Sequence, residues 1–295
     1  MKTFNKLVMA STLVGMAFSI QAKEGGDQYP NGAETFMAGA LPPPGNYFLN
    51  YAGYYSGSRH DSDGNEIDGF EVNATFNTLR IVHVSEKMIF GGNYVAHGLI
   101  PVVHQNIDIL GGPFAGENKK TGTGDITINP FAIAWHWPEF HLVSGLDINL
   151  PTGTYDKDTP VKNIGTNYYT LEPLIAGSYL NKEGWEFSAK LMYSSHFEND
   201  DTDYDSGDEF HMDYGINKHD GAWAYGIGGY YLKQLENDEQ NDTSIANSKG
   251  QVFAVGPQVK YNHEGMQFIF KWQNENSVEN RFGGDIVWFK FISRI

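Results

Sequence analysis

Residues 124–156 alternate between apolar and polar side chains and predict two strands joined by a tight turn. In the second arm, Phe140, Leu142 and Leu146 share one parity, whereas His141 and Asp147 share the other. A period of two places these two sets on opposite faces of a sheet. The stretch 137–139, Trp-Pro-Glu, interrupts the pattern and supplies the turn. Each arm has about 11 residues, the length at which a tilted strand crosses a bilayer.

The same alternation recurs along the chain and predicts twelve strands. Connections after odd-numbered strands are mostly long and acidic, such as 57–69 and 198–209, whereas those after even-numbered strands are short. This asymmetry is typical of an all-β fold, a transmembrane antiparallel up-and-down β-barrel with short periplasmic turns and long external loops. The expected strands are 46–56, 70–84, 88–103, 124–136, 140–150, 168–180, 185–197, 210–217, 222–234, 251–261, 266–274 and 281–295.

The part of the chain before the barrel divides in two. Residues 1–22 have Lys2 and Lys6 ahead of an apolar stretch and end at Ala22, which predicts a cleaved secretory signal peptide rather than a buried helix. Residues 23–45 are rich in glycine and proline, and proline cannot donate to a β-ladder. We therefore expect residues 23–45 to lie at the periplasmic mouth or in the lumen, and residues 46–295 to form the barrel.

Composition narrows the possible partners and location. The formal net charge of −16 argues against nucleic acid as a partner, and removal of the leader lysines makes the chain more acidic still. Cysteine is absent, so an exported chain of this length is not held by disulfides. Export together with a predicted barrel indicates the outer membrane of a Gram-negative bacterium. The expected partners are the lipid bilayer, lipopolysaccharide, the outer-membrane assembly machinery and a small-molecule solute.

Polar side chains on the inward parity predict the wall of a pore. A lysine on the lipid face near the bilayer midplane costs about 2–4 kcal/mol, so charged residues favour the lumen. Charged residues near strand ends, such as Lys260 and Glu186, could instead extend their side chains to the lipid headgroups. Both signs of charge occur, which suits a neutral or weakly charged solute. The predicted pore-lining residues are His141, Asp147, Asn149, Glu172, Glu186, Lys190, Lys260 and Lys271.

The sequence offers only weak signals for metals or cofactors, and none is predicted. His136 and His141 flank the Trp-Pro-Glu turn, but no third metal ligand is evident. The stretch 61–65 has part of a calcium-loop pattern but not its full twelve residues. The acidic run 198–209 is either a divalent-cation surface or a solvated loop, and the solvated loop is favoured.

Two other functions compete with a channel. Outer-membrane lipid hydrolases pair a serine with a histidine, but Ser195 and His196 are adjacent here and point to opposite faces. A G-x-S-x-G elbow is also absent from the sequence, so we do not predict an enzyme. An adhesive or structural barrel that acts through its loops is the second alternative. Conductance in a planar bilayer separates a channel from both.

Several motifs together resemble the outer-membrane channel family named after the MetA pathway of phenol degradation. They are YPNGAETF at 29–36, LPPPGNYF at 41–48, Gly124-Asp125 leading to Pro130-Phe131, GLDINLPTGTYD at 145–156, Leu-Glu-Pro at 171–173 and Val-Gly-Pro-Gln at 255–258. The chain departs from the usual outer-membrane pattern by ending on Ile295 rather than on an aromatic residue.

The resemblance implies a monomeric twelve-stranded barrel that takes up small, often hydrophobic or aromatic, molecules passively. It also implies that the N-terminal segment matters to the family. The residues of that segment expected at the mouth or in the lumen are Tyr29, Pro30, Phe36, Pro42, Pro43 and Pro44.

Overall fold

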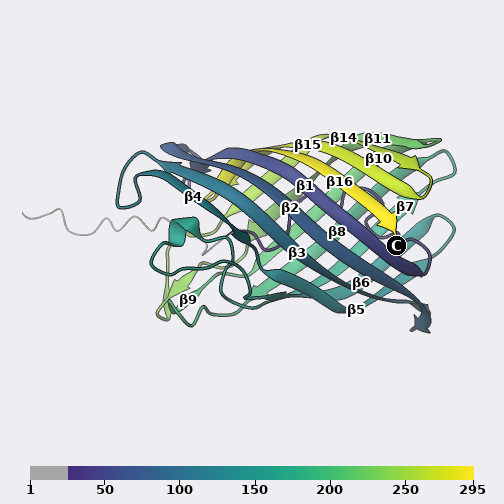
Figure 1. The fold of residues 1–295 in the computed structure, drawn as a ribbon, viewed down its shortest axis with the longest axis horizontal. Helices are drawn as coiled ribbons and strands as arrows, with labels where there is room; N and C mark the ends of the chain where they lie inside the picture. The colour runs from purple at the N-terminus through teal and green to yellow at the C-terminus, as the bar shows by residue number, and fades with distance from the viewer. Residues whose placement is uncertain (1–25) are drawn as a thin grey trace, which may run out of the picture.

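The structure, a computed structural model, describes residues 26–295, and the predicted signal peptide at 1–22 lies outside these residues. Within 26–295, no helix has the length and apolar character needed to span a membrane. The dominant element is a closed antiparallel β-barrel (Figure 1). β1 pairs with both β2 and β16, which closes the cylinder and leaves no free edge across the bilayer.

The barrel has twelve strand positions, as the sequence predicts. One position is shared by β4 and β5, which pair one after the other with β3. The strands are β1 (Gly45–His60), β2 (Glu66–Ile89), β3 (Gly92–Ile109), β4 (Gly116–Thr123), β5 (Ile126–His136), β6 (Phe140–Leu150), β7 (Thr170–Leu180), β8 (Trp185–His196), β10 (Glu209–Asp220), β11 (Trp223–Gln234), β14 (Gln251–His263), β15 (Met266–Glu279) and β16 (Phe282–Arg294).

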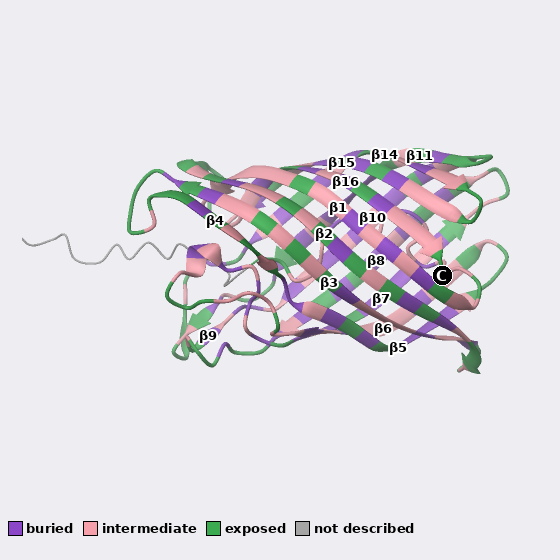
Figure 2. Ribbon diagram, viewed as in Figure 1, coloured by how far each residue is buried: buried purple, intermediate pink, exposed green. Residues whose placement is uncertain are grey.

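Burial alternates along each strand and produces the checkered pattern of Figure 2. In β8, Glu186 and Lys190 are buried, whereas the residue that follows each of them, Phe187 and Leu191, is exposed. An exposed apolar face is stable only against lipid, so the outward parity forms the bilayer contact. Large aromatic side chains stand at the short-turn end, where a membrane interface favours them: Phe90, Trp137, Trp185 and Trp223.

The two ends of the barrel differ as expected. One end carries tight turns, including 137–139 between β5 and β6, which matches the predicted turn. The other end carries the long connections. These contain the 3-10 helix η1 (Pro160–Lys162) and a small sheet of β9 (Tyr204–Asp205), β12 (Glu239–Gln240) and β13 (Thr243–Ser244). By the loop asymmetry of outer-membrane barrels, the long loops face outside and the tight turns face the periplasm.

Several predicted boundaries were wrong. The connections expected at 57–69, 218–221 and 275–280 fall largely within strands, because β1, β10 and β15 run on to His60, Asp220 and Glu279 and β2 begins at Glu66. The turn expected at 85–87 lies inside β2, where a register shift occurs between Val84 and Met88. The chain turns instead at Phe90 and Gly91, both with positive φ, in a two-residue connection that suits the twist of a hairpin. A further error is β4, which was expected as part of a glycine-rich loop. β3 and β4 continue beyond the bilayer, where a strand needs no apolar face, so alternation gives no signal there.

Residues 26–44 run inside the barrel. Their contacts progress from Arg281 near the long loops, through Asp213 in the middle, to Tyr47 and Arg294 near the tight turns. The segment is nearly without regular structure, so its backbone polar groups need partners from the wall.

Candidate functional site

Residues 26–44, the N-terminal segment, are held in the lumen by two anchors. The first is Asp213 on β10. Its buried carboxylate accepts hydrogen bonds from the Tyr29 hydroxyl at 2.7 Å, the Gly32 amide at 2.7 Å and the Glu34 amide at 2.9 Å. Bonds to an ionised acceptor are stronger than neutral ones. One inward carboxylate therefore fixes a turn of the segment against the wall.

Glu34 is the second anchor and binds across the closing seam of the barrel. Its carboxylate accepts from Lys290 of β16 at 2.6 Å, Arg80 of β2 at 3.0 Å and the Tyr51 hydroxyl of β1 at 2.7 Å. Burial alone would raise the pKa of Glu34, but the Lys290 and Arg80 cations lower it well below its usual range. Glu34 is therefore ionised at any physiological pH.

Other wall residues satisfy the backbone of the segment. Lys271 donates to the carbonyls of Gly32 and Ala33, and Glu186 accepts from the Met37 amide at 2.6 Å. At Gly215 the approach is so close that a Cβ would lie 1.9 Å from the Thr35 carbonyl oxygen. The segment is thus seated on specific side chains rather than loosely enclosed.

All eight predicted pore-lining residues lie on inward-facing positions of their strands. Seven are buried, and His141 is half-buried at the periplasmic rim. Four of them meet the N-terminal segment: Glu186, Lys190, Lys260 and Lys271. In this conformation these side chains contact protein, so a role along a solute path stays a prediction.

The other predicted pore-lining residues bond to the wall itself. Asp147 accepts from Asn129 at 2.7 Å and lies 3.2 Å from His97 and 3.9 Å from Lys190. Asn149 meets Thr127 at 2.5 Å. The Glu172 carboxylate accepts from Ser194 at 3.0 Å, and His141 meets His136 at 3.0 Å.

The predicted residues of the N-terminal segment lie either in the lumen or at the periplasmic rim. Tyr29 and Phe36 lie in the lumen, beneath Lys190 and Lys260, whose ammonium groups stand 4.1 and 5.2 Å from the ring centres. Pro30 begins the turn that Asp213 holds, its carbonyl accepting from Ala33. Pro42, Pro43 and Pro44 lie at the rim, where Pro43 accepts from Tyr47 and Pro44 from Arg294.

The sequence analysis did not predict the two anchors, Asp213 and Glu34. Asp213 and Lys290, a partner of Glu34, lie on polar inward positions of their strands. Arg80, the other cationic partner of Glu34, lies between Leu79 and Ile81 in β2. The same alternation of apolar and polar residues could have placed these three side chains on the inward face. Glu34 gave no such signal, because the N-terminal segment has no period from which to infer a facing.

Asp125, in the Gly124-Asp125 motif, organises the long loop between β6 and β7. Its carboxylate accepts from the amides of Gly153 at 2.8 Å and Thr166 at 2.9 Å, and from the Gln28 side chain at 3.0 Å. The loop is thereby fixed beside the unpaired edge of β4, where Thr154 donates its amide to the Thr123 carbonyl. This motif builds the outer wall rather than a reactive centre.

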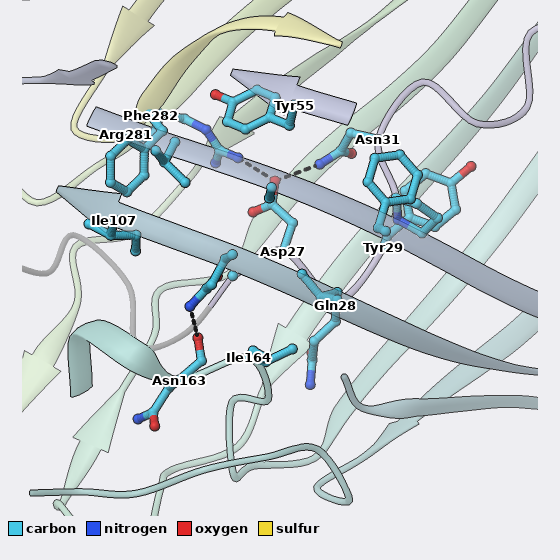
Figure 3. A pocket seen from close by; sticks show the side chains of 18 of the residues that line it. Asp27, Gln28, Tyr29, Asn31, Tyr55, Ile107, Asn163, Ile164, Arg281 and Phe282 are labelled. Atoms are coloured by element: carbon cyan, nitrogen blue, oxygen red, sulfur yellow. Dashed lines mark hydrogen bonds and ion pairs between the residues drawn. The ribbon is translucent and has the colours of Figure 1, made fainter. Parts of the chain in front are cut away.

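A cavity of about 660 Å³ occupies the outer half of the lumen, above the N-terminal segment (Figure 3). Its apolar side is formed mainly by β1, β2, β3 and β16, and its other side carries the start of the segment and the 151–169 loop. Asp27 and Arg281 project toward each other at one edge, with Tyr55 and Phe282 beside them. Principal apolar lining residues are Val72, Phe76, Leu99, Val103, Ile107, Phe282, Ile286 and Trp288.

Residues 26–295 contain no group of three or more metal-ligating side chains that could hold an ion. At the 61–65 loop, Asp61 accepts from the amides of Asp63 and Asn65 and shapes a turn. His136 and His141 bond to each other at the rim.

A serine, a histidine and an amide do come together in the lumen. Ser194 lies 2.8 Å from the ring nitrogen Nε2 of His211, whose Nδ1 lies 3.0 Å from Asn31. Ser194 also donates to Glu172, so its proton is directed to that carboxylate rather than to the histidine. The adjoining space is about 10 Å³, which leaves no room for an acyl group. The adjacent Ser195 is not part of this cluster.

The comparisons with known proteins agree with the fold. A family described as "Putative MetA-pathway of phenol degradation" matches residues 56–291. Among solved structures, an outer membrane channel from Pseudomonas putida F1 is similar with a TM-score of 0.77 and 16% identity, over 87% of this chain and 97% of that one. The transport unit of the autotransporter AIDA-I from Escherichia coli is similar with a TM-score of 0.52 and 10% identity, over 85% and 90%.

At these identities the likeness to solved structures shows the barrel fold. No curated protein sequence matches the chain. The closed twelve-stranded barrel with its lipid-facing apolar surface is an outer-membrane barrel of the Gram-negative type.

Proposed function

The chain belongs to the family of the putative MetA pathway of phenol degradation, and on that premise we propose that it is an outer-membrane channel for passive uptake of small hydrophobic or aromatic molecules. The observation that carries this proposal is the apolar cavity in the outer half of the lumen. A volume of about 660 Å³ lies within the range of small-molecule pockets, roughly 300–1,000 Å³.

The lining of the cavity favours a flat apolar solute. Phe76 and Trp288 meet edge to face with ring centres 4.8 Å apart, and Val103 and Ile107 line the same wall. Burial of apolar surface contributes about 25 cal/mol per Å², so a monoaromatic molecule gains affinity here without a specific polar contact.

The N-terminal segment lies below the cavity and is the proposed gate. Passage to the periplasm requires the segment to move, and the side chains it leaves are those predicted to line the pore, including Glu186, Lys190 and Lys271. Once the segment has moved away, these acidic and basic side chains would face the solute. We further propose that one chain suffices, since the cavity is built from one barrel.

Uptake by intact cells tests the proposal, because the lipopolysaccharide leaflet slows apolar solutes. A strain without the protein is complemented with wild type, with Ala74→Trp, which fills the cavity, or with Thr75→Trp, which faces lipid on the same strand. We expect wild type and Thr75→Trp to restore uptake of a radiolabelled monoaromatic hydrocarbon, and Ala74→Trp to fail. Equal uptake by all three strains would overturn the proposal.

Purified protein separates the alternatives. A channel conducts in a planar bilayer, whereas an adhesive barrel does not. Hydrolysis of phospholipid that is lost in Ser194→Ala would favour the enzyme instead.

A further inference from the structure

Arg59 is a cation of the lumen with no carboxylate partner within residues 26–295. It faces inward from β1, opposite Phe282 of β16, and lines the cavity. Its guanidinium stands over the Phe282 ring, whose centre lies 5.8 Å from the guanidinium carbon. A guanidinium has five donors and no acceptor, so Arg59 presents unused donors to the cavity.

Most of the other inward arginines and lysines differ in this respect. Arg80 and Lys290 share Glu34, Lys271 is held by two carbonyls and Lys190 lies near Asp147. Arg281, beside Arg59, pairs with Asp27. Lys260 also meets only an aromatic ring, that of Phe36, but it is buried against the N-terminal segment and does not line the cavity. Of these cations, Arg59 is therefore the one that lines the cavity without a matched partner, which points to a partner from outside the chain.

The carboxylates near Arg59 are already engaged. Asp27 binds Arg281 and accepts from Asn31 at 2.9 Å. Glu275 accepts from the Tyr55 hydroxyl at 2.9 Å, from the Gly284 amide at 2.8 Å and from Tyr230. None of these contacts involves Arg59, so an added anion would not displace an internal ion pair.

Aromatic and branched side chains surround this cation on the cavity side. Phe70 and Phe282 meet edge to face with ring centres 5.3 Å apart. Val72 and Ile107 belong to the same buried cluster, against which both phenylalanines pack. A planar ring fits this surface, while a planar carboxylate matches the fork of a guanidinium in a bidentate pair.

We propose that the cavity is a binding site for aromatic carboxylates, with the carboxylate on Arg59 and the ring against Phe70, Phe282 and Ile107. The inference rests on the proposed function and narrows its solute class from aromatic molecules in general to aromatic acids. Neutral aromatics of the same size occupy the apolar part of the cavity without the contact to Arg59.

Calorimetric titration of the full mature protein in detergent with two probes of matched size tests this site. Benzoate carries the acid and benzyl alcohol does not. A hydrogen bond to a charged group contributes about 1.5–3 kcal/mol, so we expect wild type to bind benzoate at least tenfold more tightly. Arg59→Gln should lose that preference while benzyl alcohol binding is unchanged. Arg59→Lys, which keeps the charge without the fork, should retain part of it.

The matched control is Lys119→Gln, which removes an exposed cation paired with Glu117 on β4, away from the cavity. It should leave both affinities unchanged. If benzyl alcohol binds and benzoate binds no better, or if Arg59→Gln keeps the preference, the carboxylate site is overturned and the channel proposal stands. If neither probe binds folded wild-type protein, the cavity is not a solute site and both proposals fall.

Discussion

The two sides of the lumen differ in chemistry although both follow the same alternation. Inward positions of β2 and β3 in the outer half are mostly apolar, including Val72, Phe76 and Val103. Inward positions of β8 and β10 carry charges, among them Lys190 and Asp213. The apolar side faces the cavity, whereas the charged side faces the N-terminal segment. Wall polarity therefore follows what occupies the lumen: an irregular backbone needs partners, and an open cavity for apolar solutes does not.

Removal of the Glu34 anchor should give the largest effect. In Glu34→Ala, Lys290 and Arg80 lose their shared carboxylate, and the loss of one partner from a buried ion pair costs about 3–5 kcal/mol. We expect the N-terminal segment to leave its seat and single-channel conductance in planar bilayers to rise. Glu117→Ala, which removes an exposed carboxylate, is the control. An unchanged conductance with the anchor removed would show that the segment does not gate the lumen.

A polar substitution on the apolar side should weaken solute binding with little effect on the segment. Val103→Asn places an amide in the cavity wall, and Val102→Asn places the same amide on the outward face. Loss of about 1.4 kcal/mol of apolar burial predicts roughly tenfold weaker binding of a neutral monoaromatic probe to Val103→Asn. Titration of both variants measures it, and equal weakening in both would remove the distinction between cavity wall and lipid face.

Neutral substitutions on the charged side should change ion selectivity modestly. If Asp147 and Lys190 line the solute path, Asp147→Asn should favour anions and Lys190→Gln should favour cations, both in a folded barrel. Reversal potentials across a salt gradient give the sign. Shifts in the same direction, or variants that disturb assembly without altering selectivity, would place these side chains outside the conduction path.

Mild acid should have the smallest effect. The pKa of Glu34 is lowered in the folded protein, so its contribution is present above its unfolded pKa of about 4.3 and is lost as pH falls through the lower folded pKa. Between pH 8 and pH 5 we therefore expect no release of the segment through this group. Conductance recorded across that range checks it. A large rise near pH 6 would mean that another group holds the segment.

Much of the barrel could be predicted because strand facing depends on local alternation alone. The β5–β6 hairpin, its turn at 137–139 and the twelve strand positions all follow from that period. The turn at Phe90 and Gly91 could not be predicted, because the polar residues at the register shift a few positions earlier have the composition of a turn. β4 could not either, because a strand in water carries no lipid-facing pattern.

The candidate site was harder to predict than the strands. Inward lysines such as Lys271 could be placed by parity, yet their partners lie on an aperiodic segment distant in sequence. Glu34 and Lys290 meet only because the barrel closes, and no local sequence pattern indicates a contact between residues so distant in the chain. The division into an apolar and a charged side depends on the path of residues 26–44, which sequence periodicity does not describe.

The position of Glu34 at the seam also bears on the order of events in assembly. Tyr51 belongs to the first strand and Lys290 to the last, and both bind the same carboxylate. The two edges that must find each other therefore share a ligand that arrives with the first strand, because Glu34 precedes β1 by about a dozen residues. A segment held at this seam would be enclosed as the cylinder closes, without being threaded into a finished barrel.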